Sequence, residues 1–116
     1  MRKLRVLRAL RVMFNLSHSA LFACSPDGRF THANESFLRM FGLADEEDAR
    51  AHVFADFMSD NPLPDNFKKA LAGETTTVGI VAETDEGEDD EELEITIAPI
   101  RSGRKVKGVA GSVVKV

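Results

Sequence analysis

The chain of 116 residues contains no tryptophan, no tyrosine and a single cysteine, Cys24. Because a disulfide within the chain needs two cysteines, none can form, and a reducing, cytoplasmic location is the default expectation. The absence of Trp and Tyr removes two side chains on which cofactors commonly stack. Eight Phe and a hydrophobic content of 43% are nevertheless enough for one core, and the length allows a single domain.

Long apolar runs are also missing from this sequence. No run reaches membrane-spanning length, and Arg interrupts every candidate core of a signal peptide, so we expect no direct membrane insertion. The net charge of −4 is unevenly distributed. Five basic residues precede the first acidic one, whereas residues 83–94 contain nine acidic residues. We interpret the acidic run as a solvated hairpin tip.

Catalytic and metal-binding motifs are absent. The three histidines lie in separate segments, without an H-E-x-x-H, C-x-x-C or Gly-rich phosphate motif. Ser17, His18 and Ser19 are adjacent residues, which cannot generally align as nucleophile and base. The acidic run lacks the alternating ligand spacing of a calcium loop. The sequence therefore predicts neither an enzyme nor a metal site.

The most informative segment is residues 20–42, ALFACSPDGRFTHANESFLRMFG. It begins as an apolar strand and then turns at residues 26–28, where Pro, Asp and Gly each favour a turn. Residues 29–33 alternate between polar and apolar side chains, as a short strand does. Asn34 is placed to cap a helix by accepting a hydrogen bond from an amide of its first turn, and Gly42 ends that helix.

This order of residues resembles the PAS sensory-domain family. In that family a two-stranded start surrounds an Asp-Gly turn, and Asn, an aromatic residue and Gly follow on and after the first core helix. Here those positions are Asp27, Gly28, Asn34, Phe37 and Gly42.

The second half of the chain agrees with the resemblance. A helix opening at Asp65 or Asn66 and ending at Gly73 precedes three strands, of which the last two read LEITIAPI and VKGVAGSVVKV. Between 43 and 61 we expect short helices, one capped by Asp45 and one over 51–59. The predicted fold is α/β (α+β): a PAS-like five-stranded antiparallel sheet with helices on one face. The PAS domain covers 17–116 and an N-terminal amphipathic flanking helix covers 1–16.

The N-terminal segment interleaves basic and apolar residues, which predicts an amphipathic helix. Its apolar stripe consists of Leu4, Leu7, Leu10 and Phe14. The resemblance implies that such a helix often pairs in PAS dimers, so we interpret the stripe as a homodimer interface. The alternatives are that the helix packs on its own domain or lies on anionic lipid. A few basic residues on one helix of an acidic chain do not make a DNA-binding domain, so no nucleic-acid partner is expected.

By analogy with PAS domains, a ligand pocket would lie between the sheet and the helices. The residues predicted to line it are Phe41, Phe54, Phe57, Met58, Phe67, Leu71, Ile80, Ile97 and Val113. These adaptable apolar side chains could equally fill a solid core. Two possibilities remain open: the pocket holds a small organic or carboxylate ligand, or the core is packed and holds no ligand.

No cofactor is expected. Light-sensing flavin members of the family carry a reactive Cys in a helix motif that is missing here, and Cys24 lies in a strand. His52 is a weak candidate for a haem ligand. The resemblance implies a sensory and regulatory domain of a larger signalling protein, with an effector domain such as a histidine kinase, a cyclic-dinucleotide enzyme or a transcription regulator. The alternative is a ligand-free module for protein dimerisation.

Overall fold

The computed structural model describes residues 2–82 and 90–116, with the side chains of residues 2–7 outside that description. It confirms the predicted fold, a five-stranded antiparallel sheet in the order β2-β1-β5-β4-β3. The strands are β1 (Ala20–Cys24), β2 (Phe30–Ala33), β3 (Thr76–Ala82), β4 (Glu91–Ser102) and β5 (Lys105–Lys115). The helices are α1 (Arg2–Leu16), α2 (Glu35–Phe41), α3 (Glu46–Arg50), α4 (Phe54–Phe57) and α5 (Leu63–Leu71).

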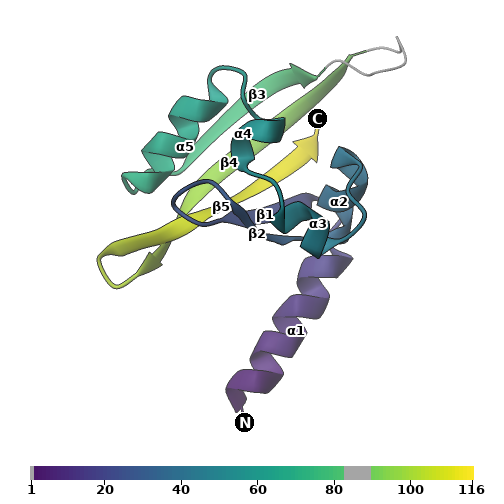
Figure 1. The fold of residues 1–116 in the computed structure, drawn as a ribbon, viewed down its shortest axis with the longest axis vertical. Helices are drawn as coiled ribbons and strands as arrows, with labels where there is room; N and C mark the ends of the chain where they lie inside the picture. The colour runs from purple at the N-terminus through teal and green to yellow at the C-terminus, as the bar shows by residue number, and fades with distance from the viewer. Residues whose placement is uncertain (1, 83–89) are drawn as a thin grey trace.

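Figure 1 shows how these elements are arranged. Helices α4 and α5 lie over one face of the sheet, while α2 and α3 lie beside β1 and β2. Helix α1 projects away from the rest of the chain, which gives the molecule dimensions of 50 × 29 × 26 Å. One end of α1 therefore joins the domain, and most of its length stands clear of the core.

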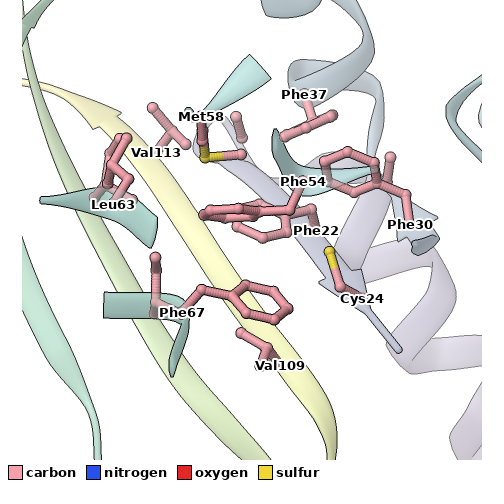
Figure 2. Packing of buried hydrophobic residues seen from close by; sticks show 14 of the residues in the cluster. Phe22, Cys24, Phe30, Phe37, Phe54, Met58, Leu63, Phe67, Val109 and Val113 are labelled. Atoms are coloured by element: carbon pink, nitrogen blue, oxygen red, sulfur yellow. The ribbon is translucent and has the colours of Figure 1, made fainter. Parts of the chain in front are cut away.

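The core is built around phenylalanine rings. Phe22, Phe30 and Phe37 are buried, with ring centroids 5.3 to 5.7 Å apart, and Phe54 joins them from α4 (Figure 2). The Phe22 ring lies across Gly111, its partner in the β1–β5 ladder, and a Cβ at Gly111 would collide with it. The glycine thus makes room for the central aromatic residue of the sheet.

The turn and the helix ends at 26–45 depend on short-range hydrogen bonds. Gly28 and Gly42 have φ of 90° and 68°, in the region that L side chains disfavour. The carboxylate of Asp27 accepts from the Ser25 hydroxyl and, at 3.4 Å, from the amide of residue 29. Asp45 caps α3 by accepting from the amide of residue 48 at 2.8 Å.

Two predicted helix boundaries are wrong. Helix α5 begins at Leu63, ahead of Asp65 and Asn66, because a first helical turn tolerates a proline such as Pro64. The helix expected over 51–59 is reduced to the four residues of α4.

The reason for the shorter helix is a competing set of bonds to β2 and its preceding turn. The amide of Phe54 donates to the Gly28 carbonyl at 2.7 Å, and the Phe30 amide donates to the His52 carbonyl at 3.2 Å. These bonds keep His52 and Val53 out of the helix, which begins at Phe54. The predicted acidic hairpin tip falls mainly on residues 83–89, outside the described residues.

Gly111→Ala should destabilise the domain by about 1–3 kcal/mol, because the added methyl group overpacks against Phe22. Gly79→Ala on the edge strand is the matched control, since its Cβ would meet only the Leu93 carbonyl oxygen at 3.9 Å. Its effect should stay within about 0.5 kcal/mol. Urea unfolding of both variants checks this, and equal stabilities would contradict the packing assigned to Phe22.

Candidate functional site

A cavity of about 500 Å³ lies between the helices and the inner face of β3, β4 and β5. Ligand sites in proteins usually measure about 300–1,000 Å³. Its lining is apolar except for Asp60, the one charged residue among the described lining residues. The lining residues are Phe41, Phe57, Met58, Asp60, Leu63, Ile80, Val81, Ala82, Leu93, Ile95 and Val113. Its size and apolar walls suit a small organic molecule.

The nine residues predicted to line a pocket divide into two groups. Those that line this cavity are Phe41, Phe57, Met58, Ile80 and Val113. Those placed elsewhere are Phe54, Phe67, Leu71 and Ile97, of which Phe54, Phe67 and Ile97 are buried in the core and Leu71 packs against it. Figure 2 shows Met58, Leu63 and Val113 at one end of the buried cluster, and Phe67 beside Val109 at the other.

Sequence reasoning missed Asp60 and Leu63, and also Val81, Ala82, Leu93 and Ile95 on the strands. Alternation along β4 does identify its inward-facing residues, which include Leu93, Ile95 and Ile97. This alternation does not show which end of the inward face lines the cavity and which end is covered by α5. The cavity therefore depends on helix placement that no local pattern encodes.

His52 lies beside two carboxylates. Its Nδ1 is 3.1 Å from Asp56 and its Nε2 is 3.9 Å from Asp48, and its ring packs on Phe57. The pKa of Asp56 lies below its usual value, because its carboxylate accepts a hydrogen bond from the Val53 amide and forms a second one with His52. His52 is not among the residues lining the cavity. Within the described residues, no group of three or more His, Cys, Asp or Glu could hold a metal ion.

Asn34 connects α1, β1 and α2. Its Oδ1 accepts from the amides of Leu21 and Phe37 at 2.9 and 3.0 Å. Its Nδ2 donates to the carbonyls of Phe14 and Ser19, both at 2.9 Å. An amide side chain has two donor hydrogens and two acceptor lone pairs, so this fully buried group is completely satisfied. The helix cap is only one of its four roles.

Two further side chains hold the end of α1. Ser36 donates its hydroxyl to the Ser17 carbonyl at 2.7 Å. Glu46 accepts through Oε1 from Arg11 at 2.5 Å and from Arg50 at 2.7 Å, and through Oε2 from an amide of β2. We call Asn34, Ser36 and Glu46 the α1 anchor. All three contacts are polar, so α1 is attached by hydrogen bonds and charge at these points.

The pKa of Glu46 lies below its ordinary value of 4.5. Burial raises it, but the hydrogen bonds from Arg11 and from the Ala33 amide, together with the charges of Arg11 and Arg50, outweigh that effect. The anchor is therefore held by an ionised carboxylate at neutral pH.

The predicted dimer stripe on α1 is only partly exposed. Leu10 is 53% exposed, whereas Phe14 is half-buried. The side chains of Leu4 and Leu7 lie outside the description. Three apolar residues outside that stripe are all exposed: Val12, Met13 and Leu16. Helical spacing alone could not show which side of α1 faces the domain.

The fold and the cavity define an α+β domain with a ligand-sized space beneath its helices. The family model described as "PAS fold" matches residues 14–116. The chain belongs to the PAS family. Comparison with curated proteins finds no significant match. Within the described part of the chain, no helix has the length and apolar character needed to cross a membrane.

Several solved structures share this fold at low sequence identity. A PAS domain from Colwellia psychrerythraea matches with a TM-score of 0.76 and 16% identity, covering 96% of this chain and 97% of that one. A domain of a sensor histidine kinase/response regulator from Geobacter sulfurreducens matches with a TM-score of 0.71 and 14% identity. The match covers 93% of this chain and 92% of that one. The Vibrio cholerae VqmA dimer, a LuxR-type receptor, matches with a TM-score of 0.73 and 15% identity. This chain spans only 51% of the length of the VqmA chain.

Asn34→Ala should destabilise the domain by about 2–4 kcal/mol, because it removes the cap and leaves buried backbone groups without partners. Asp45→Ala is the control, since it removes an exposed cap alone and should cost about 1 kcal/mol. Urea melts of the two variants give the comparison. Equal losses would show that Asn34 acts only as a cap.

Glu46→Gln should weaken the domain at neutral pH, since it removes the ion pairs with Arg11 and Arg50. Because the folded pKa of Glu46 is lowered, its stabilisation is present above the unfolded value and disappears as the pH falls through the folded value. The stability gap between wild type and variant should therefore narrow as the pH falls below 4.5. Thermal melts from pH 7 to pH 3 test this, and a constant gap would contradict it.

Proposed function

We infer that the chain is a sensory and regulatory PAS domain that binds a small apolar ligand in its cavity and transmits occupancy to α1. The observation that carries this proposal is the position of α2, which contributes Phe41 to the cavity and begins at Asn34 in the α1 anchor. Helix α2 has only seven residues, about 10 Å, so its two ends cannot move independently. The domain itself is regulatory and not catalytic.

The ligand proposal is supported by the cavity. Ten of its eleven described lining residues have apolar side chains, so burying apolar surface would contribute to the favourable free energy of binding. We propose a small organic ligand, and we propose neither haem nor flavin, since His52 lies between two carboxylates and no cysteine lies at the cavity.

The output proposal is supported by the exposed apolar residues of α1. Met13 and Leu16 are 64% and 71% exposed, which is costly in water unless a partner covers them. We propose a homodimer that uses the α1 surface formed by Val12, Met13 and Leu16 and passes the signal to an effector domain of a parent protein in the cytoplasm. Similar domains occur in a sensor histidine kinase and in VqmA, which has been solved bound to DPO. A ligand-free dimerisation module is the second candidate, favoured by the same exposed residues.

The ligand proposal predicts saturable binding of N-phenyl-1-naphthylamine, a small neutral apolar fluorescent probe. Ile80→Trp should weaken that binding by about tenfold or more, because the indole fills part of the cavity. Thr77→Trp is the matched control, since it adds the same ring to an exposed position of β3. Probe binding that is equal in the two variants, or absent in wild type, would favour the ligand-free module.

The dimer proposal predicts that Met13→Lys raises the dimer dissociation constant by about tenfold or more, because it puts a charge into the buried interface. Ala51→Lys adds the same charge at an exposed residue outside α1 and should have little effect. Sedimentation equilibrium measures both constants. A monomeric wild type at tens of micromolar would contradict the proposal.

A further inference from the structure

His52 lies between α3 and α4 and packs against a wall residue of the cavity. Its Nδ1 is 3.1 Å from a carboxylate oxygen of Asp56 on α4, and its Nε2 is 3.9 Å from a carboxylate oxygen of Asp48 on α3. Its ring centroid is 5.1 Å from that of Phe57, which lines the cavity. The two ring nitrogens of one side chain therefore face carboxylates from two different helices.

Only a charged imidazole can donate to both carboxylates. A neutral imidazole has one N–H group and one acceptor nitrogen, whereas the protonated ring has two N–H groups. In the neutral ring, one nitrogen must turn its lone pair toward an ionised acceptor. The pKa of Asp56 lies below its usual value, because Asp56 accepts from the Val53 amide and bonds to His52. Asp56 is therefore an anion between pH 5 and pH 8, the range in which histidine commonly changes charge.

Two arginines lie near this cluster, and both are held by other partners. Arg29, which precedes β2, donates from its guanidinium to the Arg50 carbonyl at 3.4 Å. The guanidinium of Arg50 donates to the Glu46 carboxylate at 2.7 Å and to the Thr31 carbonyl at 3.3 Å. The charged groups that the described contacts place at the ring nitrogens of His52 are thus two carboxylates.

Phe57 connects this cluster to the cavity. Its ring centroid is 5.2 Å from that of Phe41, a second wall residue, and 5.8 Å from that of the buried Phe30. Helix α4 has four residues, a length that is not stable in isolation, so tertiary contacts must hold it in place. The contacts of His52 are among them. A bond that steadies α4 also steadies the cavity wall, and a pre-organised site binds its ligand more tightly.

We propose that protonation of His52 tightens ligand binding in the cavity, so that the domain responds to pH as well as to its ligand. This inference rests on the ligand proposal above and adds the regulation of that site. Protonated His52 bonds to α3 and α4 together through Asp48 and Asp56 and holds Phe57 in the wall. Neutral His52 loses one of the two bonds, which loosens α4. The coupling is reciprocal, so a bound ligand favours the protonated form.

Titration of N-phenyl-1-naphthylamine at pH 5.5 and pH 8 tests the proposal, since this probe is neutral at both values. The wild-type dissociation constant should be about threefold smaller at pH 5.5, because a partly exposed ion pair contributes modestly. His52→Gln should bind equally at both pH values, since glutamine is polar but does not titrate. His32→Gln is the matched control, because His32 is an exposed histidine of β2 bonded to Thr31. It should keep the wild-type response.

Asp48→Asn is a second variant, which keeps the test decisive if His52→Gln does not fold. Asparagine can still accept from the Ala44 amide, which Asp48 binds at 3.0 Å, but it removes the charge beside Nε2. The pH response should shrink in this variant.

Three results would contradict the account in different ways. Saturable wild-type binding with equal constants at both pH values would overturn the pH response and leave the ligand proposal intact. A full pH response in His52→Gln would overturn the role of His52. The absence of probe binding at both pH values would overturn the ligand proposal and this inference together.

Discussion

The buried amide of Asn34 is the interaction on which the arrangement of this domain depends. It is fully buried and joins the end of α1, the start of β1 and the first turn of α2 through four hydrogen bonds. Each bond alone is worth about 1 kcal/mol, but a partner lost in a buried site leaves a backbone group unpaired at greater cost. One side chain therefore fixes the orientation of three elements.

Helix α2 connects the cavity to this junction. Phe41 lies on its wall at one end of α2, and Asn34 begins the same helix at the other end. A ligand that displaces Phe41 would act on a short rigid element whose opposite end holds α1. Ser36 and Glu46 reinforce that end. Under the proposed function, any coupling between a ligand and α1 can be no larger than the difference in ligand affinity between two states of the domain.

The parts of the fold that follow short-range rules could be predicted from the sequence. The turn before Arg29, the capped α2 and the alternating strands depend on neighbouring residues, and the family resemblance fixed their order. The length of α4 could not be predicted, because it is set by the bond from Phe54 to the distant Gly28 carbonyl. Only some of the cavity residues and some of the exposed α1 residues could be predicted, because they too depend on contacts between segments that are distant in the sequence. Their positions depend on how α1 and α5 pack, which no local pattern specifies.

The central claim is that Asn34 attaches α1 to the domain through polar contacts. Amide hydrogen exchange measured by NMR in wild type and Asn34→Ala tests it most directly, because protection is read residue by residue. A 15-residue helix is marginal in isolation, so α1 amides should lose protection while those of β4 and β5 largely retain theirs. Unchanged protection in α1, or an equal loss across α1 and the sheet, would contradict the account.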